Sequence, residues 1–241
     1  GATILTSESR NDINILGFFA QQTFGLGERL FLTAAGRYDV SSVFGEEDRW
    51  QFYPKVSASY LISNEEFWQG ISSIVPILKL RASYGEAGNL TAIGPYDRYT
   101  NFNPVAAPGL PGFVPSSLLG NPGIVPERQK ETEVGADMSF LDGRLGLEFS
   151  YFRKEVEDLL LFISLTPSSG YLNQYANVGN MTNKGFEFLL TGAPVQSSNI
   201  NWKTTITYSR IRNKVNNVPG GVLPFPGGFG QVAAVNGFPL G

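Results

Sequence analysis

The chain contains no cysteine, no histidine and only two methionines among its 241 residues. Without Cys and His it cannot build the usual zinc or haem sites, a Cys-His nucleophile or a Ser-His-Asp triad. It also lacks any run of 18 apolar residues, so no transmembrane helix is predicted. The net charge is only −3, which argues against nucleic acid as a partner. These absences predict no catalytic, cofactor-binding or metal site.

A β-hairpin with two different faces is predicted over residues 131–153. Side chains alternate along a strand, so each arm has an apolar and a polar side. The Asp142-Gly143 pair between the arms is a strong two-residue turn signal, and it places Phe140 opposite Leu145. The apolar side holds Thr132, Val134, Ala136, Met138 and Phe140, and then Leu145, Leu147, Phe149 and Tyr151. Each arm is about as long as a tilted membrane-spanning strand, which needs roughly 9–11 residues.

Six further strands follow from the same alternation. Together with the hairpin they predict eight antiparallel strands, at residues 14–24, 29–39, 50–62, 78–85, 131–140, 145–153, 184–193 and 202–211. Pro54 lies inside the third strand, and proline lacks the N–H that a ladder needs. That position therefore predicts a bulge or an unpaired edge.

The predicted connections are sorted by length. Those after the first, third, fifth and seventh strands are short to middling, and a helical turn is expected at residues 65–68. The others are longer, at residues 40–49, 86–129, 159–183 and after 213. Short turns at one end and long loops at the other are typical of an outer-membrane barrel. The predicted fold class is therefore all-β, an antiparallel up-and-down section of a transmembrane β-barrel with about 8 to 10 strands.

Four segments carry a family resemblance. They are residues 78–89 (LKLRASYGEAGN), 121–131 (NPGIVPERQKE), 177–187 (NVGNMTNKGFE) and 237–241 (GFPLG). In this order they resemble the SusC/RagA-type TonB-dependent outer-membrane transporters of the Bacteroidetes. The resemblance implies a plugged barrel of about 22 strands. Residues 1–241 would be part of the barrel domain, with the plug domain and the C-terminal strands absent. The start at Gly1-Ala2-Thr3 shows no signal peptide, which fits either a protein that is not exported or a piece of a longer chain.

The resemblance also implies a function. It implies TonB-dependent import of a nutrient, an oligosaccharide or a peptide, across the bacterial outer membrane, with no enzymatic activity. The implied partners are a SusD-like surface lipoprotein, TonB acting through the missing N-terminal part, and outer-membrane lipid. Two alternatives stay open: a passive porin or adhesive barrel, and a soluble β-sandwich that serves as a binding module.

Charged side chains on the polar side of the strands are predicted to line the lumen. They are Lys79, Arg81, Glu131, Glu133, Asp137 and Glu148. A carboxylate cluster of this kind could also serve glycosidase chemistry or hold calcium, but a hydrated wall is the simpler interpretation. The hairpin register places Asp137 opposite Glu148, a repulsive pair. We therefore expect Lys79 or Arg81, on a neighbouring fourth strand, within ion-pair distance of Asp137 or Glu133.

Aromatic side chains suggest two further features. Tyr96, Arg98, Tyr99 and Phe102, in the longest loop, are candidate substrate contacts, because rings bury a large area and tyrosine keeps a polar handle. The alternative is that these rings pack the loop against its neighbours. A second group near strand ends is predicted to form an interfacial girdle, namely Trp50, Tyr53, Tyr84 and Trp202.

Overall fold

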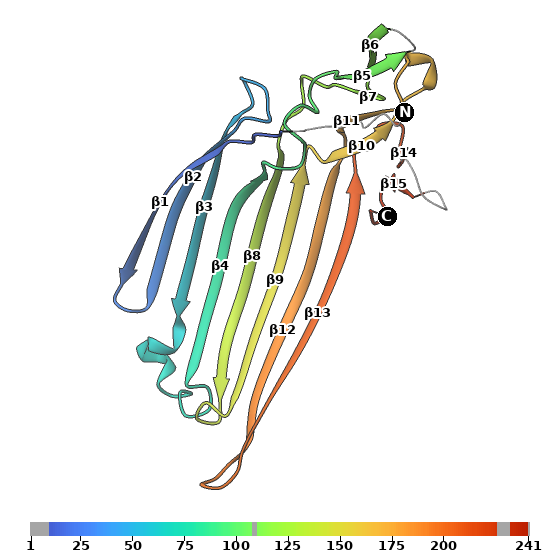
Figure 1. The fold of residues 1–241 in the computed structure, drawn as a ribbon. Coiled ribbons are helices and arrows are strands. Elements are labelled where there is room, and N and C mark those ends of the chain that lie inside the picture. The colour runs from blue at the N-terminus through green and yellow to red at the C-terminus, as the bar shows by residue number, and fades with distance from the viewer. Residues whose placement is uncertain (1–9, 108–109, 226–231, 241) are drawn as a thin grey trace.

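One antiparallel sheet of eight long strands dominates the computed structural model, which describes residues 10–107, 110–225 and 232–240. The strands are β1 (Ile15–Leu26), β2 (Leu30–Ser41), β3 (Trp50–Leu61), β4 (Ile77–Asn89), β8 (Glu127–Phe140), β9 (Leu145–Glu157), β12 (Asn180–Gln196) and β13 (Asn201–Asn216). Their order in the sheet is β1-β2-β3-β4-β8-β9-β12-β13, so each long strand pairs with the next one along the chain (Figure 1). This up-and-down order confirms the predicted fold class. In the part of the chain that the structure describes, no helix is long and apolar enough to cross a membrane.

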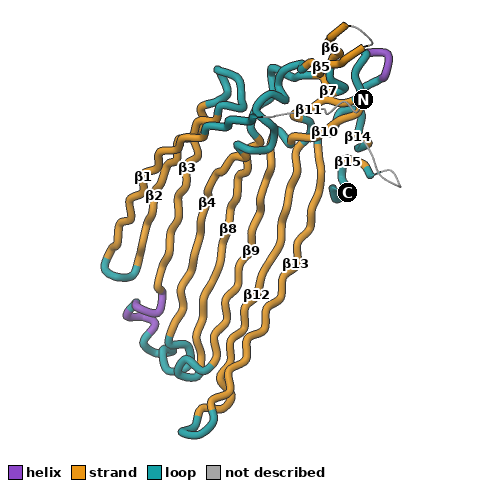
Figure 2. Tube along the Cα trace, viewed as in Figure 1, coloured by secondary structure: helices purple, strands orange, loops and turns teal. Residues whose placement is uncertain are grey.

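The connections are sorted by end as predicted (Figure 2). The turn end has short links and two 3-10 turns, η1 (Ile62–Asn64) and η2 (Glu66–Trp68). The loop end carries short strands and one 3-10 turn: β5 (Phe102–Ala107), β6 (Leu110–Pro115), β7 (Leu118–Leu119), β10 (Leu160–Ser164), η3 (Pro167–Ser169), β11 (Asn173–Asn177), β14 (Val222–Pro224) and β15 (Ala233–Val235). The long loops are therefore built from small sheets, where irregular chain was expected. Residues 108–109, 226–231 and 241 of the predicted loops and motifs lie outside the described residues.

Several strands run further toward the loop end than predicted. β8 begins at Glu127 rather than at residue 131, and its first residues pair with the end of β4, where Asn89 lies opposite Glu127. Backbone hydrogen bonds form irrespective of side-chain type. The four residues added to β8, Glu127 to Lys130, are polar on both faces, so hydrophobic alternation does not reveal them, although the ladder continues through them.

The hairpin register is confirmed, but its turn is not the predicted two-residue loop. Phe140 pairs with Leu145 and Asp137 with Glu148. The Arg144 N–H donates to the Leu141 carbonyl at 3.1 Å, the hydrogen bond expected of a turn around Asp142-Gly143. Leu141 itself has φ 53°, in the left-handed region next to Asp142 at 56°. Its backbone therefore leaves the ladder, and four residues connect β8 to β9 in the same register.

Pro54 marks an unpaired edge, as predicted. β3 pairs with β4 only from Lys55 to Leu61, and the ladder stops next to Pro54. The Arg128 side chain reaches into this gap, donating to the Phe52 carbonyl at 3.2 Å and to Gln51 Oε1 at 3.0 Å. Tyr53 also lies there, only 4% exposed. The prediction that Tyr53 belongs to an interfacial girdle is therefore wrong, because its ring packs over Gly88 of β4, where a side chain would leave no room for it, and beside Arg128.

The long sheet has no core of its own. Its apolar side is exposed on all its strands, with Phe18, Phe52 and Ile206 each more than half exposed. Burial is concentrated at the loop end, in one cluster of Val43, Phe44, Leu90, Ile93 and Ile124 and another of Val156, Leu159, Leu161, Val215, Val218 and Ala234. A β-sandwich would bury one face of the sheet against a second sheet. Among the described residues no second long sheet is present, which excludes the sandwich alternative.

Candidate functional site

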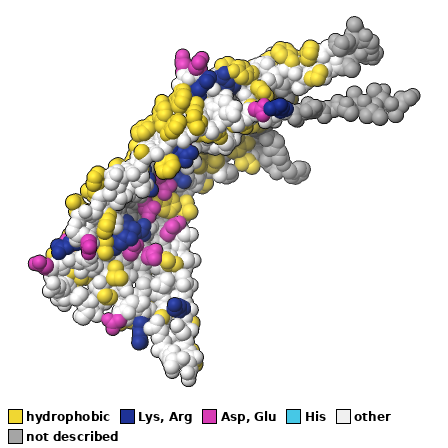
Figure 3. Space-filling model, turned by 60° about the vertical axis from the view of Figure 1, so that its left-hand side comes forward, with side chains coloured by type: hydrophobic (Ala, Val, Ile, Leu, Met, Phe, Trp, Pro, Cys, Tyr) yellow, Lys and Arg dark blue, Asp and Glu magenta, His cyan; other side chains and the backbone are white. Residues whose placement is uncertain are grey.

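The two faces of the sheet differ in chemistry. Opposite residues in neighbouring strands project from the same face, so the register assigns each side chain to one side. The apolar face carries Leu78, Leu80 and Ala82 of β4, Val134, Ala136 and Met138 of β8, Leu147 and Phe149 of β9, Phe186 and Phe188 of β12, and Ile206 and Tyr208 of β13. The polar face carries the charges that the sequence analysis assigned to a lumen. Figure 3 shows acidic and basic side chains lying close together across the middle of the molecule.

An ion-pair network joins β4 to β8 on the polar face. Lys79 Nζ lies 3.1 Å from Asp137 Oδ2, directly across the two strands. Arg81 contacts Asp137 Oδ1 at 3.0 Å and Glu133 Oε1 at 3.2 Å. The predicted ion pair and strand order are thus confirmed. Each pair is part-exposed and is worth about 1 kcal/mol or less.

Arg81 spans three strands because a glycine faces it. Gly135 lies opposite Arg81 in the β4–β8 ladder. A Cβ at Gly135 would lie 3.0 Å from Arg81 Nη2 and 2.8 Å from the Phe149 carbonyl oxygen. With no side chain there, the guanidinium passes over β8 and donates to Ser150 Oγ on β9 at 3.2 Å. A small residue on β8 therefore lets one cation organise the polar face of three strands.

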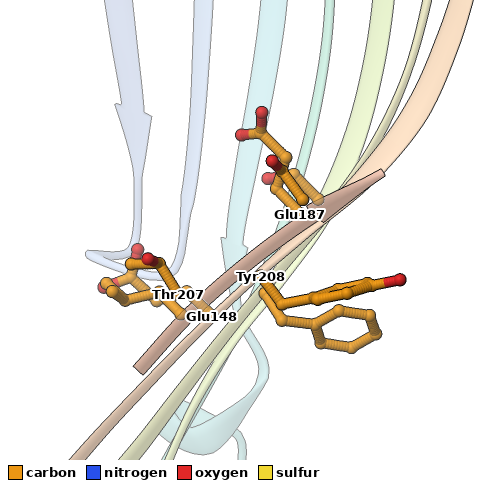
Figure 4. A pocket seen from close by; sticks show the side chains of 8 residues that line it. Glu148, Glu187, Thr207 and Tyr208 are labelled. Carbon is orange, nitrogen blue, oxygen red and sulfur yellow. The ribbon is translucent and has the colours of Figure 1, made fainter. Parts of the chain in front are cut away.

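Acidic side chains continue across the polar face. Glu131 is 3.4 Å from Lys154, the attractive pair that the register places opposite it. Glu148 and Glu187 line a shallow hollow of about 320 Å³ with Thr207. Figure 4 shows Tyr208 pointing to the opposite side of the sheet from these three residues. No group of three or more metal-ligating side chains that could hold a metal ion occurs among the described residues, so the calcium alternative gains no support.

The four candidate substrate contacts lie at the loop end. Tyr96, Tyr99 and Phe102 are 52%, 46% and 62% exposed, so none of these rings is packed into a core. Arg98 stacks over the Tyr99 ring at 4.4 Å, a cation–π contact that orients both side chains. Phe102 opens β5, opposite Pro115 of β6. The chain therefore presents three rings and a guanidinium within seven consecutive positions of one exposed loop.

A side-chain clamp that the sequence patterns did not predict holds the loops together. Asn177 Nδ2 donates to the carbonyls of Val125 at 2.9 Å and Asp158 at 2.8 Å, while its Oδ1 accepts from the Val125 N–H at 2.9 Å. Glu127 acts similarly: its Oε1 accepts from the Leu160 N–H at 2.8 Å. Both residues lie in the motifs that carried the family resemblance. The signal available for Asn177 was an asparagine in a predicted loop, because an asparagine side chain can hydrogen-bond backbone groups.

Replacing Asn177 by alanine should loosen the loop end without unfolding the sheet. Three side-chain hydrogen bonds are lost, and we expect local opening to become easier by about 1–2 kcal/mol. Hydrogen exchange of the intact protein should then be faster at Val125 and its neighbours. Asn173→Ala, on the same strand β11, is the matched control, because its side chain makes no hydrogen bond within the described residues. Unchanged exchange in Asn177→Ala would contradict the clamp.

Family comparisons agree with this geometry. The family model described as "TonB dependent receptor-like, beta-barrel" matches residues 2–231. The chain belongs to this family. The match covers all eight long strands and the short loop strands from β5 to β14; β15 lies beyond it.

Curated relatives are all much longer than this chain. It is 35% identical to TonB-dependent receptor P26 of Formosa agariphila, over 90% of this chain and 22% of that receptor. It is 25% identical to TonB-dependent receptor SusC of Bacteroides thetaiotaomicron, over 86% of this chain and 21% of SusC. The chain thus spans about a fifth of the length of these relatives. The resemblance to SusC/RagA-type receptors is confirmed by the family model and by these relatives.

Solved structures show the same fold. The RagAB peptide transporter superposes with a TM-score of 0.85 at 24% identity, over 95% of this chain and 25% of that chain. The siderophore receptor PirA of Pseudomonas aeruginosa gives a TM-score of 0.56 at 18% identity, over 92% of this chain and 39% of that receptor. The fold of this chain therefore superposes better on RagAB than on PirA.

Proposed function

We propose that this chain forms part of an outer-membrane transporter that imports an oligosaccharide or a peptide by a TonB-dependent mechanism. The observation that carries the proposal is the sheet itself, which has one exposed apolar face, one charged face and all its long loops at one end. An apolar face of this kind suits lipid, and a charged face suits a wet lumen. The named relatives are receptors and transporters, which supports a protein without enzymatic activity.

The eight strands would be one arc of a larger barrel. The two edge strands, β1 and β13, do not pair with each other in the described structure. Open edges in lipid leave backbone groups unpaired, and each such group costs several kcal/mol. We propose that residues 1–241 lie within a barrel domain whose other strands and plug domain lie outside this chain. Its partners would be TonB, reached through an N-terminal part, outer-membrane lipid, and a SusD-like surface lipoprotein over the loops.

The polar face would then line the lumen, with Lys79, Arg81, Glu131, Glu133, Asp137 and Glu148 as its charges. The loop contacts would be Tyr96, Arg98, Tyr99 and Phe102. Exposed rings on a short loop can stack against the faces of sugars or against peptide side chains. The Arg98–Tyr99 stack supplies a charged donor beside a ring, which suits the hydroxyls of a glycan or the carboxylate of a peptide.

Uptake by cells that carry the intact receptor tests this proposal. Labelled peptides and labelled oligosaccharides should be offered separately, in cells with and without TonB. We expect uptake of one of these classes and its loss without TonB. A passive porin would keep its uptake without TonB, and that result would overturn the proposal.

Variants of the loop rings test the substrate contacts. Replacing Tyr96, Tyr99 and Phe102 together by alanine should lower the affinity for the transported substrate about tenfold, the loss expected from roughly 1.4 kcal/mol of stacking. Phe67→Ala is the matched control, because Phe67 is an exposed ring at the turn end, far from the loops along the strands. Equal uptake by the triple variant and the control would remove these residues from the substrate site.

A further inference from the structure

On the apolar face, the side chains of β9, β12 and β13 change from apolar to cationic toward the loop end. Toward the loop end, β9 passes from Phe149 and Tyr151 to Arg153. On β12 the order is Phe188, Phe186 and then Lys184, and on β13 it is Ile206, Tyr208 and then three cations. We call these five cations the outer basic patch: Arg153, Lys184, Arg210, Arg212 and Lys214. All five project from the apolar face, at its loop end.

Strand register brings the patch into one surface. Arg153 lies opposite Lys184, and Lys184 lies opposite Arg212, so three cations form a row across three strands. Like charges directly opposite destabilise a sheet. Two adjoining hollows, of about 490 and 320 Å³, are lined by these cations together with Tyr151 and Phe186. Lys184 and Arg212 therefore cost stability unless an anion neutralises them, whereas Arg153 has a carboxylate of its own strand beside it.

On the neighbouring strands, cations at the loop end form ion pairs with carboxylates of the chain itself. On the loop end of β8, Arg128 pairs with Glu86 and Lys130 with Glu157, and on β9 Arg153 pairs with Glu155. In contrast, no salt bridge involves Lys184, Arg210, Arg212 or Lys214 within the described ranges. The outward positions of β12 and β13 carry no Asp or Glu, and Glu187 projects from the other face (Figure 4). Glu155 of β9 projects from the same outward face, opposite Thr182, but its carboxylate pairs with Arg153. The other four cations of the patch are therefore available to an anionic ligand.

We propose that the outer basic patch binds the phosphate groups of a phosphorylated glycolipid in the outer leaflet, whose acyl chains lie along Phe186, Phe188 and Tyr208. This inference rests on the proposed function, since only a membrane places lipid against this face. Guanidinium groups bind phosphate with paired hydrogen bonds, and lysine adds a point charge. The aromatic rings directly below the cations occupy the level where apolar chains meet headgroups. Charge and apolar surface thus match the two parts of one amphipathic ligand.

Lipid binding by the intact receptor tests the proposal. The probe is diphosphorylated lipid A in phosphatidylcholine vesicles, with dephosphorylated lipid A as the comparison, and bound lipid is measured by native mass spectrometry after extraction. We expect retention of the phosphorylated form and at least a tenfold loss of affinity in the double variant R210Q/R212Q, as expected when two charge-assisted contacts are removed. The variant R210K/R212K, which keeps the charge, should retain part of the binding.

Two controls keep the result interpretable. K55Q/K203Q removes the same charge from the polar face and should bind lipid within about twofold of the unchanged receptor, because screening leaves distant charges little influence. Heat-modifiable gel mobility checks that each variant is folded. Equal binding by R210Q/R212Q and K55Q/K203Q would overturn the inference, and so would displacement of the lipid by millimolar inorganic phosphate.

The two proposals fail in different ways. A receptor that does not fractionate with the outer membrane, or whose uptake does not need TonB, contradicts the proposed function. A receptor that fractionates and transports as expected, but binds lipid A equally with and without Arg210 and Arg212, contradicts only the outer basic patch.

Discussion

Leu147→Arg should destabilise the intact receptor by roughly 2–4 kcal/mol in a bilayer, the cost of a cation on the lipid face near the midplane. Leu147 projects from the apolar face of β9, between Met138 of β8 and Leu190 of β12. Its neighbours are all apolar, so an arginine there finds no counter-charge. The measurement is a denaturant titration of the full-length protein folded into lipid vesicles.

The matched control is Ser139→Arg. Ser139 follows Met138, so it lies at the same depth as Leu147 but projects from the polar face, two positions from Asp137. We expect a small change for this variant, because water and an acidic neighbour are available. Ser150 is less suitable, since its hydroxyl already contacts Arg81 and Glu133. Equal losses in Leu147→Arg and Ser139→Arg would reverse or abolish the assignment of the two faces.

Gly135→Val should cost about 1–3 kcal/mol, as expected for overpacking. The new side chain would meet the backbone carbonyl of Phe149 at 2.8 Å and displace the Arg81 guanidinium, which lies 3.0 Å from the ideal Cβ. A backbone atom inside a ladder cannot move aside without weakening the β8–β9 pairing. The measurement is the same vesicle titration, with equilibrium unfolding of each variant.

Gly192→Val provides the control for this substitution. Gly192 is also a strand glycine, on β12, but no atom lies within 4 Å of the Cβ that a side chain would add. The same valine should therefore be nearly neutral there. Adding Arg81→Ala to Gly135→Val should recover only part of the loss, since the contact with Phe149 remains. A neutral Gly135→Val would show that Arg81 does not need this space.

The alternation of apolar and polar residues along the chain correctly predicted an antiparallel sheet of eight long strands. The β8–β9 hairpin shows why: its apolar residues repeat every second position, and only one register aligns them across the pair. The same register predicted the Lys79–Asp137 and Arg81–Glu133 contacts, because opposite residues in neighbouring strands share a face. The lengths of the connections predicted that all the long loops lie at one end of the sheet. These features depend only on neighbours along the chain or directly across one strand pair.

Features at the loop end were missed or misassigned because they depend on distant contacts. Tyr53 is buried because its ring packs over Gly88 of β4, beyond the end of the β3–β4 ladder, and next to Arg128 of β8. Asn177 became a clamp because β11 folds back beside Val125, more than fifty positions earlier. The outer basic patch shows the same limit: its cations are separated along the chain by up to about sixty positions and meet only through the strand register.

The sequence by itself determined the antiparallel strands, their two faces, the side-by-side order of the polar-face charges and the family, because a period of two and an ordered set of motifs are properties of the chain alone. Only the tertiary structure decided where each ladder ends, which side chains hold the loops and which cations lack a carboxylate nearby. Those outcomes depend on how segments far apart in the chain are brought together. The burial, hydrogen-bond partners and local charge of a side chain follow from these distant contacts and not from its residue type.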